Sequence, residues 1–449
     1  MIKLKKGLNL PITGEPSQVL HDGPRISRVA LLGDDVVGMK PTMAVKVGDQ
    51  VKTGQLLYTD KKTEGVLYTS PGSGEVVEIN RGDKRKFLSV VIKLSGSDEH
   101  VAFNSFKGAT VDSYNEQGVK DLLIESGMWP SLRRRPFSKA AVPTERPSAI
   151  FVNAMDTHPL AANPMLFIKE HQAAFLNGLK VLGKLTDKVH VCAAPDANLD
   201  VASAANATLN TFKGPHPAGL SGTHIHFLHP VGEKNFVWYT NYQDVIAIGK
   251  LFETGQLFLD RMVSVAGPAA RNPRVVKTRM GASLEELTKD ELFENTETRI
   301  ISGSVFGGRK AQTGVEYLGR FHHQVSLLRE GRDRELLGWH SPGFDRYSVK
   351  PIYVSKLFGN KKYDFTTNAH GSLRSIVPIG SYEKVMPLDI LPTFLVRSLM
   401  SKNTDMSIKL GALELDEEDM ALVTFVDPCK NDFATKLREN LTLIEKEGL

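Results

Sequence analysis

The fold of the N-terminal part of the chain is decided by two stretches, Val45-Lys46-Val47-Gly48-Asp49-Gln50-Val51-Lys52-Thr53-Gly54-Gln55-Leu56-Leu57 and Ser70-Pro71-Gly72-Ser73-Gly74-Glu75-Val76. Short apolar runs alternate in them with turn signals, and glycine supplies the backbone angles that tight corners need. The same pattern extends outward from Leu31 to Leu94. It predicts a small β domain.

These two stretches resemble the barrel-sandwich fold of biotinyl and lipoyl carrier domains. Carrier domains present a modified lysine on a hairpin, and Asp60-Lys61-Lys62 falls near the corresponding turn. One hypothesis is therefore a lipoyl or biotinyl group on Lys61 or Lys62. The alternative is an unmodified hairpin with solvated lysines. The absence of Met-Lys-Met or a close equivalent favours this alternative.

A chain of 449 residues exceeds what one hydrophobic core usually serves, so several domains are expected. We predict a multidomain α/β and α+β protein. Its parts are an N-terminal segment with the barrel-sandwich β domain (1–105), a degenerate Rossmann-like α/β domain (106–256), a small α+β (SLBB-like) domain (257–330) and a mainly helical C-terminal region (331–449).

Alternating helices and apolar strands from about Gly118 indicate the α/β domain. The expected order is a helix ending at Gly127, a strand at 149–153, a helix capped by Asn163-Pro164, a strand at 188–192 and a helix from Tyr242 to Phe252. A strand at 261–265 and a short helix at 283–287 are expected in the next domain. In the tail, we expect two apolar helix faces: Ile390, Leu391, Phe394, Leu395 and Leu399, and Phe433, Leu437, Leu441 and Ile444.

The formal charge of +5 and the basic clusters at 81–86 and 133–135 favour anionic partners. No helix-turn-helix pattern, zinc-finger spacing or basic–aromatic stripe points to nucleic acid. Anionic lipid or an acidic protein face fits the charge equally well. No apolar run approaches the length of about 20 residues that a spanning helix needs, and the start lacks a secretory apolar stretch, so we expect a cytoplasmic location.

The two cysteines, Cys192 and Cys429, cannot complete a disulfide framework, a four-cysteine zinc site or an iron–sulfur cluster. We expect buried free thiols. A nucleotide-binding Rossmann turn is rich in glycine, but no G-x-G-x-x-G occurs. Where such a loop is sought, the chain reads Gly127-Met128-Trp129-Pro130-Ser131-Leu132-Arg133-Arg134-Arg135-Pro136-Phe137. Its arginines could pair with phosphate, or the loop could be solvated or face a partner.

The richest polar cluster is the segment from Gly214 to Pro230. On a strand, His224 and His226 would share one face and could bind a metal, and the role of His216 in this cluster is left open. The alternatives are packing and hydrogen bonding, which we favour because no zincin pattern is present, or proton relay near a quinone. We therefore assign no metal ligand and no catalytic residue.

Two further polar groups also lack a chemical signature. The pair His322-His323 has no recognisable catalytic neighbour, and G-x-S-x-G is missing. The run Asp416-Glu417-Glu418-Asp419 lacks the spaced ligands and the turn glycine of an EF-hand calcium site. Its carboxylates are better suited to starting a helix.

Three segments identify a family more firmly than any catalytic motif. They are Ile2 to Ile12, the Gly214-Pro215-His216-Pro217-Ala218-Gly219 run with its His224-Ile225-His226, and Val263-Ser264-Val265-Ala266-Gly267-Pro268. All resemble the A subunit of the bacterial sodium-translocating NADH:quinone oxidoreductase, end to end. That family is related to the flavoprotein subunit of complex I and to the Rnf-type C subunit. The present sequence departs from those relatives in its loop at 127–136 and in lacking their cysteine runs.

The resemblance implies a peripheral subunit on the cytoplasmic face of the bacterial inner membrane, docked to membrane-embedded partners. The complex would oxidise NADH, reduce ubiquinone and export sodium. NADH oxidation, flavin and iron–sulfur clusters would belong to partner subunits, and the isolated chain would not be catalytic. Ubiquinone is the candidate ligand, with pocket residues unassigned. The alternatives are a carrier protein using Lys61 or Lys62 and an Rnf-type C-like subunit.

Overall fold

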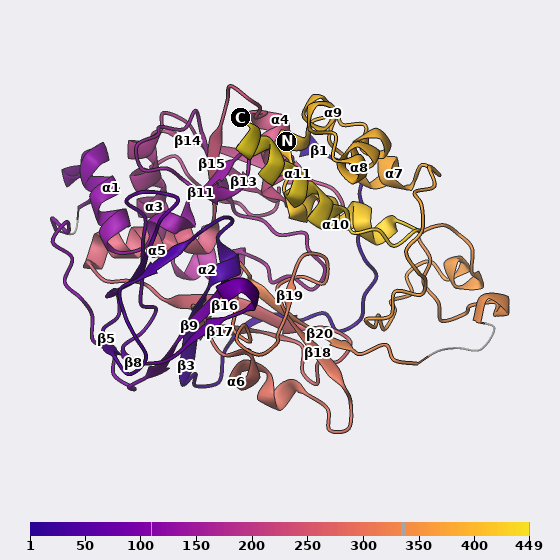
Figure 1. Cartoon of the computed structure of the whole chain (residues 1–449), viewed down its shortest axis with the longest axis horizontal. Coiled ribbons are helices and arrows are strands. Elements are labelled where there is room, and N and C mark those ends of the chain that lie inside the picture. Colours follow the sequence, from indigo (N-terminus) through magenta and orange to yellow (C-terminus); the bar gives the residue numbers. More distant parts are fainter. Residues whose placement is uncertain (109, 334–337, 449) are drawn as a thin grey trace.

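The computed structural model describes residues 1–108, 110–333 and 338–448, and its strands form four sheets (Figure 1). The N-terminal β domain consists of two small antiparallel sheets around a core that includes Leu57, Val76 and Val90. Their orders are β3 (Arg28–Leu32), β9 (Phe87–Leu94), β8 (Gly74–Arg81) and β5 (Gln50–Val51), and β4 (Pro41–Met43), β6 (Leu56–Asp60) and β7 (Leu67–Thr69). The turn from β6 to β7 exposes Lys61 and Lys62, as expected of the predicted hairpin.

The α/β domain has one seven-stranded sheet, in which five strands run parallel. Its order is β1 (Ile2–Lys3), β14 (Ala207–Lys213), β13 (Val189–Ala193), β12 (Ile150–Asn153), β15 (Val237–Asn241), β10 (Arg133–Arg135) and β11 (Lys139–Ala140). The chain proceeds outward from β12 through β13 to β14, then returns to place β15 on the other side of β12. This is the Rossmann order, with the topological switch point between β12 and β15.

The helices of this domain are α1 (Glu116–Glu125), α2 (Met165–Glu170), α3 (Gln172–Leu185), α4 (Ser221–Leu228) and α5 (Tyr242–Thr254). The predicted single helix after Asn163 was wrong in one respect, because it is broken at His171 into α2 and α3. The His171 backbone leaves the helical region, and its ring packs against Phe167 and Phe258 at 4.6 and 5.1 Å. The spacing of apolar residues that predicts a helix carries no information about this aromatic packing, so it could not predict the break at His171.

The third part has a six-stranded sheet and one short helix, α6 (Leu284–Thr288), capped by the Ser283 side chain. The sheet order is β19 (Arg309–Lys310), β18 (Thr298–Ser302), β20 (Gln324–Arg329), β16 (Asp260–Ala266), β17 (Arg274–Arg279) and β2 (Ser17–Asp22). Strands β1 and β2 therefore carry the first residues of the chain into two different domains before the β domain begins at β3.

The C-terminal region is helical from Ser381 onward, with its own apolar core. Its helices are α7 (Ser381–Val385), α8 (Pro392–Ser401), α9 (Thr404–Lys409), α10 (Glu417–Val426) and α11 (Phe433–Glu447). Residues 341–380 instead run over the surface with a single 3₁₀ turn at Val354–Leu357. The predicted apolar face of α8 also divides, because Leu395 and Leu399 are buried whereas Leu391 and Phe394 are exposed. Among the helices described, none is long and apolar enough to cross a bilayer.

Candidate functional site

A polar cavity of about 320 Å³ lies at the carboxyl ends of β12 and β15. Open α/β sheets bind ligands at this place, outside the strand ends at the switch point. Asn153 and Asn241 are paired neighbours at these ends, and the Asn241 side chain also caps α5. Residues from all four parts of the chain line the cavity, including Asp35, Asp156, His322, His323 and Glu418.

An aspartate–histidine pair lies in the turn that follows β12. The Asp156 Oδ1 and His158 Nδ1 atoms are 2.8 Å apart. Burial alone would lower the pKa of His158, but the Asp156 carboxylate outweighs it and raises that pKa. Burial opposes ionisation of Asp156 as well, but the charge and hydrogen bonds of His158 lower the Asp156 pKa. Both shifts favour the form of the pair in which Asp156 is a carboxylate and His158 an imidazolium.

Neutral histidines face this charged pair. The ring of His216 lies 4.8 Å from that of His158, and burial together with the His158 charge lowers the His216 pKa. Burial lowers the pKa of His322 and of His323 to about 4. The His322 Nδ1 atom lies 2.8 Å from the Ser302 hydroxyl, which also accepts the Gly319 backbone N–H. These imidazoles are uncharged at neutral pH and can donate or accept one hydrogen bond at each ring nitrogen.

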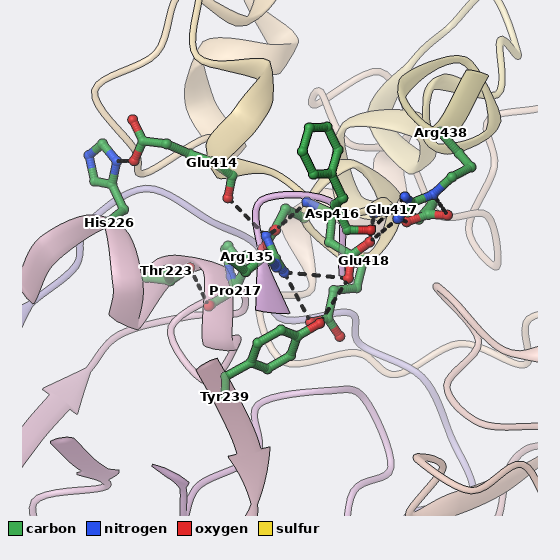
Figure 2. A network of polar contacts seen from close by, with 12 residues as sticks. Arg135, Pro217, Thr223, His226, Tyr239, Glu414, Asp416, Glu417, Glu418 and Arg438 are labelled. Carbon is green, nitrogen blue, oxygen red and sulfur yellow. Dashed lines mark hydrogen bonds and ion pairs between the residues drawn. The ribbon is translucent and has the colours of Figure 1, made fainter. Parts of the chain in front are cut away.

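A buried charge network closes the cavity from the C-terminal side (Figure 2). Arg135 of β10 is 0% exposed, and its Nη1 donates to Asp419 Oδ2 at 2.9 Å and to the Glu414 carbonyl at 2.8 Å. Arg438 of α11 donates to Asp416 at 2.9 Å. Burial opposes ionisation of Asp416, but Arg135 and Arg438 hold its pKa far below the usual value. Burial and Asp416 raise the Glu417 pKa to about 7.

Two hydroxyl groups at the cavity have no hydrogen-bond partner among the described residues. Ser138 and Thr240 both line the cavity and are only 4% and 2% exposed. A buried polar group without a partner costs free energy, so such groups are commonly completed by water or a ligand. The cavity therefore offers unused donors beside neutral imidazoles.

Three family models match the chain in consecutive segments. Residues 2–95 match the NqrA N-terminal barrel-sandwich hybrid domain, residues 114–257 the NqrA second alpha/beta domain, and residues 262–313 the NQRA C-terminal domain. The A subunit of the Na(+)-translocating NADH-quinone reductase from Saccharophagus degradans is 57% identical over 449 residues, covering 100% of both chains. The corresponding subunits from Hahella chejuensis and Vibrio parahaemolyticus are 55% and 54% identical, also over 100% of both chains.

The chain belongs to the NqrA family, the A subunits of Na(+)-translocating NADH-quinone reductases. It is thus part of that multi-subunit enzyme, and the four-part fold class predicted from the sequence is confirmed. A chain of an NAD⁺-reducing [NiFe]-hydrogenase is 12% identical over 51% of this chain and 49% of its own, with a TM-score of 0.36. That value is too low to carry an argument.

The histidines that the sequence singled out in this NqrA-type chain occupy separate environments. The strand on which His224 and His226 would share one face is not formed, because both lie on α4, where residues two apart point to different sides. The buried His224 hydrogen-bonds the Ala218 carbonyl at 2.9 Å. His226 pairs with Glu414 at 2.7 Å (Figure 2). It also accepts the Asp389 backbone N–H. Both rings thus take part in hydrogen bonds within the fold. Within the described residues, no group of three or more His, Cys, Asp or Glu side chains is placed to hold a metal ion.

The arginine loop also differs from its prediction. Residues 127–137 are not the turn after the first parallel strand; they form a 3₁₀ turn and strand β10. Arg135 is fully buried and Arg133 lies between the rings of Tyr239 and Phe321 at 4.4 and 4.1 Å, whereas the Arg134 side chain is 30% exposed. The turn after β12 is residues 154–164, which contain no glycine. The loop still borders the cavity through Arg133 and Ser138.

Other predictions about polar groups are confirmed. Asp416 caps α10 in a capping box with Asp419, as expected of a helix start. Cys192 and Cys429 are buried free thiols. Sequence reasoning did not assign Asp156, His158, His322 and His323 to a site. The position of Asp156 and His158 directly after a predicted parallel strand was the available signal, and His322 and His323 carried none.

Proposed function

We propose that this chain is a peripheral subunit on the cytoplasmic face of the bacterial inner membrane that supports the quinone-reducing step, and that the cavity receives a quinone headgroup. The supporting observation is the pair of unpartnered hydroxyls, Ser138 and Thr240, at the switch-point cavity. Quinone carbonyl oxygens accept hydrogen bonds, so they would satisfy these donors. The imidazoles of His322 and His323 add neutral donors.

Quinone reduction also consumes protons. Glu417, with a pKa of about 7, and the Asp156–His158 pair line the cavity and can hold protons near neutral pH. The role of this chain in the proposal is to bind and orient the headgroup and to supply protons. Electrons come from a redox partner within the same enzyme.

We further propose that the chain carries no flavin or iron–sulfur cluster of its own, and that NADH is oxidised by a partner in the complex. A dinucleotide or flavin phosphate needs backbone N–H groups in a glycine-rich turn, and the turn at 154–164 has no glycine. The carboxylates of Asp416, Glu417 and Glu418 at the cavity disfavour a phosphate. Two buried cysteines supply too few ligands for a cluster.

Photolabelling with a ubiquinone analogue tests the quinone part. The whole membrane complex is labelled with and without excess ubiquinone, and modified peptides are mapped. We expect displaceable labelling in peptides around Ser138, Asp156 and Thr240. Labelling restricted to other subunits would disprove quinone binding by this chain and leave it with a docking role.

The cofactor part is tested on the purified chain. We expect no flavin absorbance, no iron and no NADH oxidation by the chain alone, with all three present in the complex. Stoichiometric flavin on this chain would contradict the proposal. Intact-mass analysis of the same sample addresses the carrier alternative, because a lipoyl or biotinyl adduct on Lys61 or Lys62 would establish it.

A further inference from the structure

Exposed apolar side chains are concentrated in one part of the chain. Of the sixteen large hydrophobic side chains that are exposed among the described residues, eleven lie between Phe344 and Met406. Leu357 is 82% exposed, Ile352 74% and Leu373 72%. Single exposed hydrophobic residues are ordinary, but a concentration of this kind marks an interaction site.

The surface segment 341–380 is held in place without a core of its own. Only Gly343, Ser355 and Tyr363 are buried within it. Contacts to its neighbours fix it instead: the Arg374 backbone N–H donates to the Cys429 carbonyl at 3.0 Å, and the Tyr347 ring lies 6.2 Å from that of Phe425. In Figure 1 this orange stretch forms the edge of the molecule beyond α7 and α10. The segment thus presents its apolar side chains outward.

Helix α8, which follows this segment in the chain, also exposes apolar side chains. Phe394 and Met400 of α8 are 59% and 40% exposed and Leu391 at its N-cap is 60% exposed, whereas Leu395 and Leu399 are buried. The outward part of α8 thus presents Phe394 and Met400 beside the exposed Arg397.

The same range of the chain is basic, although Lys362 and Lys402 pair with Glu15 and Glu439 outside it. Residues 341–410 contain ten Lys or Arg and five Asp or Glu, a net charge of +5, which equals that of the whole chain. Seven of the ten cations are lysine. Lys384, Arg397 and Lys409 are exposed and have no carboxylate partner within the described part of the chain. We call the exposed apolar and basic residues of this range the 341–410 surface.

We propose that the 341–410 surface docks the chain directly onto anionic phospholipid. Lysine is depleted at protein–protein interfaces, whereas lysine around exposed Phe, Leu and Ile is typical of a membrane-interface contact. Each cation near an anionic bilayer is attracted to it, and the apolar side chains enter the headgroup boundary. The inference rests on the peripheral attachment in the proposed function. Its test uses no quinone, so quinone binding and lipid docking can fail separately.

Vesicle co-sedimentation of the full chain tests this docking. We expect binding to vesicles of equal phosphatidylcholine and phosphatidylglycerol, little binding to phosphatidylcholine alone, and release at high salt. The double variant Leu391→Ser/Phe394→Ser should bind about tenfold more weakly. Arg397→Glu/Lys409→Glu should also lose about tenfold. The matched controls Val47→Ser and Lys93→Glu, exposed in the β domain, should bind like the unaltered chain.

A depth probe separates insertion from charge attraction alone. Phe394→Cys can be labelled selectively with an environment-sensitive fluorophore because Cys192 and Cys429 are buried. Its emission should shift to the blue on anionic vesicles, and that of labelled Val47→Cys should not. No vesicle binding, or unchanged binding of the Leu391→Ser/Phe394→Ser variant with native melting temperature, would overturn the proposal. If these variants instead lose assembly with the detergent-solubilised membrane subunits, the surface is a protein interface.

Discussion

At the residue scale, Arg135 is the side chain whose environment most constrains the site. Arg135 is the last residue of β10, and its fully buried charge pairs with Asp419 and lies near Asp416. Replacing it with Met would leave these buried carboxylates without a counter-charge. We expect the Arg135→Met variant to lose ~3–5 kcal/mol of unfolding free energy, measured by urea denaturation.

Two further variants check that this loss is electrostatic. Arg135→Met/Asp419→Asn removes one of the stranded charges and should recover part of the stability. Arg146→Met removes a surface arginine that pairs with Glu116 and Asp187, and should cost at most ~1 kcal/mol. Equal losses for Arg135→Met and Arg146→Met would show that the buried network contributes no special stability.

The cavity histidines predict a dependence of stability on pH. His322 and His323 have folded pKa values near 4, below the unfolded value of about 6.5. The unfolded chain therefore binds more protons between these values, and stability falls as the pH falls from about 6.5 toward about 4. Asp156, with a lowered pKa, loses its contribution as the pH falls further, and His158, with a raised pKa, loses its contribution as the pH rises above about 6.5.

The His323→Phe variant isolates one of these groups, because a phenyl ring preserves the edge contact of 5.3 Å with Tyr242. Its melting temperature should fall less between about pH 6.5 and about pH 4.5 than that of the unaltered chain. The reason is that unfolding of the variant takes up about one proton fewer in this range. Replacement of the exposed His21 gives the control. A parallel decline for all three proteins would contradict a neutral His323 in the fold.

Contacts between individual side chains were the feature that the sequence predicted least well. Arg135 and Asp419 are 284 residues apart, and no local pattern relates them. The sequence correctly predicted Asp416 at a helix start because a cap depends on its own next few residues. The same rule could not show that this cap also completes a cavity with His322, since that contact depends on how four domains pack.

At the scale of elements, α3 and α5 pack so closely that glycine is required on both. A Cβ atom at Gly178 would lie 2.1 Å from the Val245 carbonyl oxygen, and one at Gly249 would lie 1.8 Å from that of Ala174. Figure 1 shows the two helices as neighbours on the left of the view. We expect Gly249→Ala to destabilise the protein by ~1–3 kcal/mol despite alanine's higher helix propensity, measured as a lower melting temperature.

Gly183, near the end of α3, supplies the matched control. A Cβ atom there would meet Asn206 at 3.4 Å, which is ordinary contact. Gly183→Ala should therefore be neutral or stabilise by up to ~1 kcal/mol. If both substitutions raised the melting temperature, close helix packing would not be the reason for glycine at position 249.

Element prediction succeeded where local signals agreed and failed where tertiary contacts decided. The strand at β12 and the helix α5 follow directly from apolar runs and caps. The break at His171 depends on Phe258, far along the chain. The division of α8 into a buried and an exposed side depends on which neighbours the helix meets, which periodicity alone does not state.

At the scale of the whole molecule, the first residues of the chain connect three domains. β1 joins the seven-stranded sheet beside β14, and the Gly7 backbone N–H donates to the Lys384 carbonyl of α7 at 3.0 Å. The Thr13 N–H donates to the Tyr363 carbonyl at 3.1 Å, and β2 joins the six-stranded sheet beside β17. The N-terminal segment therefore couples the α/β domain, the SLBB-like domain and the C-terminal region before the β domain begins.

This arrangement predicts that removing residues 2–10 separates the melting of domains that otherwise melt together. The deletion removes strand β1, the buried Leu4 and the packing of Leu8 against the C-terminal core, while most of each part's core residues remain. Calorimetry should resolve an additional transition at lower temperature. Leu4→Asp should have a similar but smaller effect, with a cost of ~3 kcal/mol, because it places a charge among the apolar residues that surround Leu4.

The exposed neighbour Lys5 provides the control, since Lys5→Ser changes the same segment without touching a core. It should leave a single, unshifted transition. The cavity provides an independent readout, because it is lined by all of the parts that the segment connects. If the segment couples the domains, the deletion should also weaken displaceable quinone labelling, whereas Lys5→Ser should not. A truncated chain that melts in one step with undiminished labelling would show that the interdomain contacts around Arg135 suffice to hold the domains together.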